Sequence, residues 1–191
     1  MRTSAGSLGQ PLRSVAGVLV AAVTITLAAA SPTPASACTC PVRSDAACVN
    51  TAASGIGSPY RWGGARWSTY DRNWAGADCS GFVVKCWQVP RASSIYEEYH
   101  PYGTYHLFNT SAHWYSIGRA SAARADAVGY PDPDAGGPMT GHVVLYDRGD
   151  PYGWALVYEA PGTGKRIRHA WRDISASKWK FRRRHNLVRS S

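Results

Sequence analysis

Acidic side chains are scarce in this chain of 191 residues, which has 12 aspartates and glutamates against 21 lysines and arginines. The formal net charge is +9, which favours anionic polymers as partners, although basicity also aids solubility. Internal repeats are absent, and no long apolar run occurs beyond residue 30. These absences exclude a repeat protein and a membrane protein with several spans.

The first 37 residues have the pattern of a secretory signal peptide. Arg2 and Arg13 precede an uncharged, largely apolar run over residues 15–30, and Ala35-Ser36-Ala37 forms a signal-peptidase site. The run is short for a membrane span, so we expect cleavage rather than a retained anchor. Cleavage would leave residues 38–191 as one secreted or wall-associated domain of net charge +7. It would also expose Cys38, and lipid attachment there is the second possibility.

Five cysteines in an exported chain leave one unpaired if the others form bridges. Cys38, Cys40, Cys48 and Cys86 would form two disulfides, for which three connectivities exist. Cys79 would then be the free thiol. Lipidation of Cys38 would invalidate this count.

A nucleophile is predicted within Asp78-Cys79-Ser80-Gly81-Phe82-Val83, where a loop leads into an apolar helix over residues 79–89. The helix N-terminus carries partial positive charge and free N–H groups, which favour the thiolate form of a cysteine. Pro90 stops this helix. The competing interpretation is that Cys79 is a disulfide partner.

A base and a third catalytic group follow in the strand-rich half of the chain. His142 lies at the start of a predicted strand, where it would deprotonate Cys79 and later protonate a leaving amine. Glu159 ends the next predicted strand, and a hairpin would bring it beside His142 to orient the imidazole. A surface role for Glu159 is the alternative, and His169, one strand later, is the competing third residue.

The order of elements predicts an α+β fold. A short helix is expected over residues 44–53, capped by Ser44 or Asp45. About five antiparallel strands are expected at residues 127–130, 142–146, 154–160, 166–171 and 179–188. Residues 65–77 are an aromatic loop suited to the wall of a groove, and residues 91–125 show no clear periodicity.

Several of these motifs together resemble the NlpC family of papain-like cell-wall cysteine peptidases. The resemblance runs from about residue 44 to residue 171, and its landmarks are Gly57-Ser58-Pro59-Tyr60-Arg61-Trp62-Gly63-Gly64, Asp78-Cys79-Ser80-Gly81-Phe82, Ala125-Asp126-Ala127-Val128, Gly141-His142-Val143 and Glu159-Ala160-Pro161.

The resemblance implies a papain-like domain in which Cys79 is the nucleophile and His142 the base, and it implies cleavage of peptide bonds in peptidoglycan stems. It also places Tyr60 beside the thiol as a substrate or oxyanion contact. Trp62, Asp78 and Ser80, from the same motifs, are further candidate substrate-binding residues. Peptidoglycan is the expected partner, with anionic wall polymers as a second. We expect a monomer without cofactor or nucleic-acid partner.

The chain departs from the family pattern at Glu159, because the family's third residue is usually histidine. A Cys-His-Glu set also resembles the amidases of the CHAP class, so an N-acetylmuramoyl-L-alanine amidase is the first alternative. Acyl transfer to an amine other than water is another. A non-catalytic wall-binding module held by disulfides is the alternative from a different class of protein.

Other polar clusters favour structural roles. His100, His106 and His113 are spaced by six and seven residues, which suits packing or the surface better than a metal site. Asp132 and Asp134 are interpreted as turn residues rather than calcium ligands. The basic segment 178–185 is interpreted as a solvated edge strand, with binding of wall polymers as the alternative.

Overall fold

The computed structural model describes residues 40–90, 99–109, 113–132 and 140–190. The predicted signal peptide, Cys38 and Asp134 lie outside these ranges. Within the described ranges, the helices are all too short or too polar to cross a membrane.

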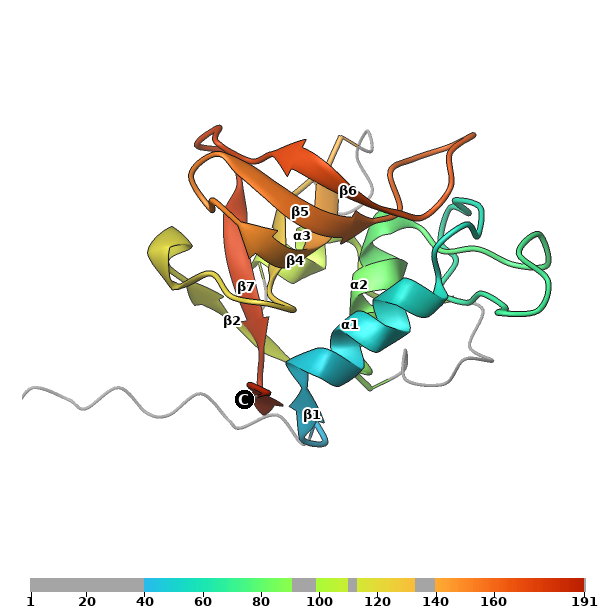
Figure 1. Ribbon diagram of the computed structural model, residues 1–191, viewed down its shortest axis with the longest axis horizontal. Coiled ribbons are helices and arrows are strands. Elements are labelled where there is room, and N and C mark those ends of the chain that lie inside the picture. The colour runs from blue at the N-terminus through green and yellow to red at the C-terminus, as the bar shows by residue number, and fades with distance from the viewer. Residues whose placement is uncertain (1–39, 91–98, 110–112, 133–139, 191) are drawn as a thin grey trace, which may run out of the picture. The chain divides into compact units, whose positions relative to one another are not determined.

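A six-stranded antiparallel sheet forms the centre of the described fold, in the order β2-β7-β3-β4-β5-β6 (Figure 1). Its strands are β2 (Trp114–Ile117), β3 (Ala127–Tyr130), β4 (His142–Gly149), β5 (Trp154–Glu159), β6 (Arg168–Asp173) and β7 (Lys180–Arg184). A separate parallel pair joins β1 (Arg43–Ser44) to β8 (Leu187–Val188). The predicted mixture of helices and antiparallel sheet is confirmed. The sheet has one strand more than expected, because β2 lies in the stretch that showed no periodicity.

Within the described residues, three α-helices and one 3-10 helix accompany the sheet: α1 (Asp45–Ser54), α2 (Cys79–Trp87), α3 (Thr104–Asn109) and η1 (Arg119–Ser121). The Ser44 hydroxyl caps α1 by accepting the N–H of Ala47, as predicted. Helix α2 ends at Trp87, and its C-cap Gln88 adopts the left-handed conformation two residues before Pro90. The predicted helix therefore exists and is two residues shorter than expected.

The sheet is buried on both faces. On one face, Val143 and Leu145 of β4 pack with the apolar side chains of α2, and α1 in turn packs on α2 (Figure 1). On the other face, Val144 and Tyr146 join the side chains of β5 and β7. Burial on both faces explains the continuous apolar runs over residues 143–146 of β4 and 155–158 of β5. It also fixes the start of β4, and hence His142, beside the start of α2.

The basic C-terminal segment is not an edge strand, so that prediction is wrong. β7 lies between β2 and β3, and its arginines make contacts within the protein. The guanidinium of Arg184 is buried and donates to the carbonyls of Trp87, Pro41 and His185. Arg183 pairs with the buried carboxylate of Asp126 at 2.7 Å. These two cations therefore serve the fold and are not free for wall polymers.

Replacing Arg184 by alanine should destabilise the protein by roughly 2–4 kcal/mol, because three carbonyl groups lose a charged donor in a buried site. Urea unfolding measures this change. Arg148→Ala is the matched control, since its side chain is largely exposed and its pair with Asp147 is worth under about 1 kcal/mol. Equal losses for the two variants would contradict the structural role of Arg184.

The predicted pair of disulfides is also wrong. Cys48, Cys79 and Cys86 are all free, which leaves at most one bridge for five cysteines. Cys48 and Cys86 are fully buried between α1 and α2, where burial raises the pKa of both thiols. They behave as small apolar side chains of the core. The prediction that Cys79 is unpaired is confirmed.

Candidate active site

Cys79 is the first residue of α2, and a network around Asp78 holds it there. The Asp78 carboxylate caps the helix by accepting the N–H of Gly81 at 2.6 Å, and it also accepts the N–H of Gly63 at 2.9 Å. Gly81 is required because a Cβ at this position would come within 2.1 Å of the Gly64 carbonyl oxygen. The loop and the helix start are thus locked together, with Cys79 at the junction.

The environment of the Cys79 thiol differs from the sequence prediction. Burial and the negative charge of Asp78 raise the pKa of Cys79 to about 12, although the N–H groups of Val143 and Ser80 lower it. The capping carboxylate offsets the positive end of the helix, which the sequence prediction counted as favouring the thiolate. Cys79 is therefore a neutral thiol in the unliganded protein and needs a base to remove its proton.

His142 and Glu159 come together as predicted. Nε2 of His142 lies 3.1 Å from Oε2 of Glu159, because the β4–β5 hairpin brings the end of β5 beside the start of β4. An ionised carboxylate only accepts hydrogen bonds, so Nε2 carries the proton of a neutral His142. Nδ1 is then the nitrogen with a free lone pair.

Glu159 is fully buried, so the alternative of a surface glutamate is wrong. Burial opposes its ionisation, but the hydrogen bond from His142, the charge of Arg172 and the hydrogen bond from Arg168 outweigh it and lower the pKa to about 2. Arg168 Nη2 lies 2.7 Å from Oε1, and Arg172 Nη2 lies 2.5 Å from Oε2. The sequence pattern revealed neither arginine: Arg168 lies opposite Glu159 only in the register of β5 against β6, and Arg172, which pairs with Ala155, reaches Glu159 from further along β6.

His169, the competing third residue, is occupied elsewhere. Its ring stacks on Tyr158 with centroids 3.9 Å apart, and its Nε2 lies 3.1 Å from the Asp147 carboxylate. The hydrogen-bond partner of His142 is thus Glu159.

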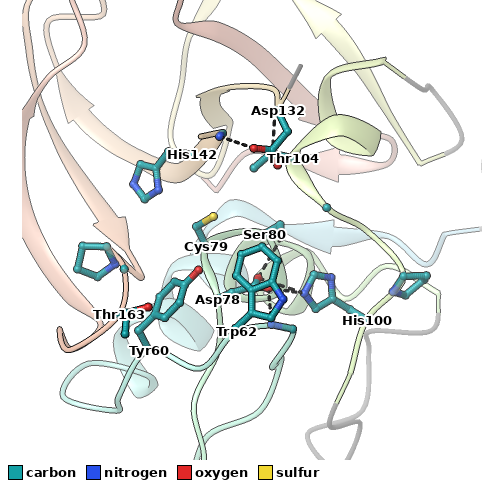
Figure 2. Close-up of a pocket in the computed structure, with 16 residues that line it drawn as sticks. Tyr60, Trp62, Asp78, Cys79, Ser80, His100, Thr104, Asp132, His142 and Thr163 are labelled. Carbon is teal, nitrogen blue, oxygen red and sulfur yellow. Dashed lines mark hydrogen bonds and ion pairs between the residues drawn. The ribbon is translucent and has the colours of Figure 1, made fainter. Parts of the chain in front are cut away.

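A cavity of about 480 Å³ brings the candidate residues together. It is lined by Tyr60, Trp62, Asp78, Cys79, Ser80 and His142 among others, and Figure 2 shows Cys79 between Tyr60 and His142 in that view. Backbone bridges at Pro59 and Tyr60 to Arg166 and Ala77 anchor the loop that carries Tyr60. Burial raises the pKa of Tyr60, as does the nearby Cys79, so its hydroxyl keeps its proton.

Asp78 and Ser80 line the cavity, but their side-chain oxygens form hydrogen bonds within the protein. The Ser80 hydroxyl donates to Asp78 Oδ1 at 3.0 Å. Nε2 of His100 lies 3.1 Å from the same oxygen (Figure 2). The Tyr102 N–H donates to the other ring nitrogen of His100. His100 is therefore part of the site, whereas the sequence suggested only a packing or surface role.

Asp132 forms a second group of hydrogen bonds in the wall of the cavity. Its carboxylate accepts the N–H of Gly141 and the hydroxyl of Thr104, each at 2.6 Å (Figure 2). A Cβ on Gly141 would come within 2.2 Å of that hydroxyl, so only glycine fits. These contacts fix the residue directly before His142. The turn role predicted for Asp132 thus includes the positioning of His142.

The carboxylate of Asp132 also raises the pKa of Cys79 and of Tyr60. Asp132→Asn removes this negative charge and should lower the pKa of Cys79. Alkylation of Cys79 by iodoacetamide at alkaline pH should then be about threefold faster, since only the thiolate reacts. Peptide mapping measures the rate, and Asp173→Asn on the exposed side of β6 is the control. A slower reaction in Asp132→Asn would contradict this electrostatic role.

No family model matches the chain, and no curated protein matches it. Among solved structures, it is similar to the NlpC/p60 domain of the peptidoglycan hydrolase SagA, with 22% identity and a TM-score of 0.44; the match covers 72% of this chain and 96% of that chain. It is also similar to a lipoprotein-like protein of the NLP/P60 family from Staphylococcus aureus subsp. aureus Mu50, with 18% identity and a TM-score of 0.44 over 71% of this chain and 40% of that one. Both TM-scores are low, so the assignment of the site rests on the contacts described above.

Proposed function

We propose that the protein is a secreted, papain-like cysteine peptidase that hydrolyses peptide bonds in the stem peptides of peptidoglycan. The observation that carries this proposal is a free thiol and a carboxylate-bonded histidine in the walls of one cavity. In this proposal, residues 1–37 are removed on export, and the domain of residues 38–191 acts at the cell wall. Peptidoglycan is proposed as the substrate because the motifs around Tyr60, Cys79 and His142 resemble those of the NlpC family.

The first half of the reaction forms an acyl-enzyme. Nδ1 of His142 accepts the proton of Cys79 while the sulfur attacks the scissile carbonyl carbon. The backbone N–H of Cys79 and the protonated hydroxyl of Tyr60 stabilise the negative oxygen of the tetrahedral intermediate. The C–N bond then breaks, and the leaving amine takes the proton from His142.

The second half releases the acid. Neutral His142 accepts a proton from a water molecule, whose oxygen attacks the thioester carbon. The C–S bond breaks, and the proton returns to the sulfur. Glu159 stays ionised throughout and stabilises the imidazolium that forms in each half. Arg168 and Arg172 keep this carboxylate charged in a buried site.

An N-acetylmuramoyl-L-alanine amidase is the second candidate, and the Glu159 carboxylate in the third position favours it. Mass spectrometry of fragments released from purified sacculi distinguishes the two activities. A peptidase produces a new amino terminus within the stem, whereas an amidase frees the stem intact. Release of intact stems alone would overturn the peptidase assignment while leaving the Cys79 mechanism in place.

A further inference from the structure

The loop between Tyr60 and Cys79 forms two further cavities beside the one that holds the thiol. A cavity of about 360 Å³ lies next to it and shares Trp62 as a wall. A third cavity of about 490 Å³ shares Trp74 with the second. Each neighbouring pair thus shares one tryptophan as a wall, and the third cavity shares no lining residue with the cavity of Cys79. We call this series of three the row of cavities.

The side chains of this row are aromatic and exposed. Trp62 is 59% exposed, Trp74 is 48% exposed and Tyr70 is 99% exposed. Tyr99, also exposed, lines the middle cavity. Large apolar side chains in a concave surface mark a binding site more often than chance exposure does. Exposed aromatic side chains along a concave surface suit a long ligand with flat apolar faces.

The loop that carries these rings is anchored at several points. The indole N–H of Trp67 donates to the Ser54 hydroxyl at 3.0 Å, and the Trp67 ring packs on Phe82 of α2. The Arg72 guanidinium donates to the Ser54 carbonyl, and Arg166 donates to the Asn73 side chain at 2.8 Å. These contacts anchor the loop that carries the exposed rings to the rest of the domain. Because the loop is already held in place, it would lose little conformational entropy when a ligand binds.

Cations accompany the rings in the middle cavity. Arg61 and Arg66 both line it, and the guanidinium of Arg66 lies 4.4 Å from the centroid of the Trp74 ring. Guanidinium groups only donate hydrogen bonds, so this cavity suits a ligand rich in hydroxyl and carbonyl oxygens. Sugar rings combine such oxygens at their edges with apolar C–H faces that pack on aromatic rings.

We propose that the row of cavities from Trp62 to Tyr70 binds the carbohydrate strand that carries the stem peptides. The choice of polymer rests on the proposed function, because a strand bound there would present a peptide branch to the cavity of Cys79. Trp62 stands where the peptide meets the sugar chain. Trp74 and Tyr70 provide stacking platforms further along, and Arg61 donates to sugar oxygens.

The test uses the full chain with Cys79→Ala, so that binding is measured without cleavage. The probe is a fluorescently labelled glycan strand freed of its stem peptides, and fluorescence anisotropy gives its affinity at about 0.15 M salt. Adding Trp74→Ala should weaken binding ~10-fold, and Arg61→Gln should weaken it severalfold. Trp154→Ala is the matched control, since this tryptophan is 60% exposed on β5 and lies outside all three cavities.

The proposal would be overturned if Cys79→Ala and its double variant with Trp74→Ala bound the peptide-free glycan strand with equal affinity. It would also be overturned if Cys79→Ala showed no measurable binding to that strand. Selective binding of a polyglycerol-phosphate chain in place of the peptide-free strand would also overturn it and assign the row to anionic polymers. Failure of the proposed function appears separately, as loss of stem cleavage by the wild-type protein. The anisotropy result does not depend on that activity.

Discussion

Cys79→Ala should reduce release of fragments from purified sacculi by at least roughly 10⁴-fold, to the level of buffer alone. The acyl-enzyme cannot form without the sulfur, and neither His142 nor Tyr60 can replace it as the nucleophile. The fold should be retained, because exchanging a thiol for a methyl group leaves only a small void at a residue that is 7% exposed. Turbidity of a sacculus suspension measures the activity, and circular dichroism measures the fold.

Cys86→Ala is the matched control for this experiment. Cys86 is also a free, buried cysteine of α2, but it packs in the core and does not line the cavity. We expect a loss of about 1–2 kcal/mol of stability with sacculus lysis preserved. If Cys79→Ala lysed sacculi as fast as Cys86→Ala, the assignment of the nucleophile would be wrong.

Glu159→Gln should lower kcat about a thousandfold, because a neutral amide neither fixes the tautomer of His142 nor stabilises its imidazolium. It should also destabilise the fold by roughly 2–4 kcal/mol, since Arg168 and Arg172 lose their shared carboxylate. Hydrolysis kinetics and urea unfolding measure the two effects. His169→Ala is the comparison variant and should keep most of the activity, because His169 contacts Tyr158 and Asp147 instead.

The stability effect of Glu159→Gln has a defined pH dependence. The pKa of Glu159 is lowered in the folded state from 4.5 to about 2, so ionised Glu159 stabilises the fold above pH 4.5. This contribution is lost as the pH falls from 4.5 towards 2. The difference in unfolding free energy between wild type and variant should therefore shrink over that interval. A difference that grew on acidification would contradict the ion-pair account.

The sequence predicted the positions of Cys79, His142 and Glu159 because each depends on a local pattern. The step from loop to apolar run placed Cys79 at a helix start, and strand alternation turned Glu159 inward towards His142. Both inferences need only the regular periods of helix and strand and one hairpin. The predicted helix start at Cys79 and the predicted contact between His142 and Glu159 are correct, because local pattern and tertiary structure agree at these positions.

Long-range pairing explains what the sequence did not predict. β2 and His100 lie in a stretch whose aromatic and polar residues follow neither period, and β2 is ordered mainly by pairing with β7. Placement of β2 beside β7 is also the reason that the basic segment is internal. The raised pKa of Cys79 depends on its burial and on the negative charge of Asp78, and the depth of that burial cannot be read from the spacing of residues.

Titrating the native protein with iodoacetamide, and following activity and Cys79 modification in the same samples, tests the central claim most directly. Peptide mapping gives the modified fraction of Cys79, and sacculus lysis gives the remaining activity. We predict that the two change together, one equivalent at Cys79 removing all activity while Cys48 and Cys86 stay unmodified. Lysis that persists after Cys79 is fully alkylated would contradict the account.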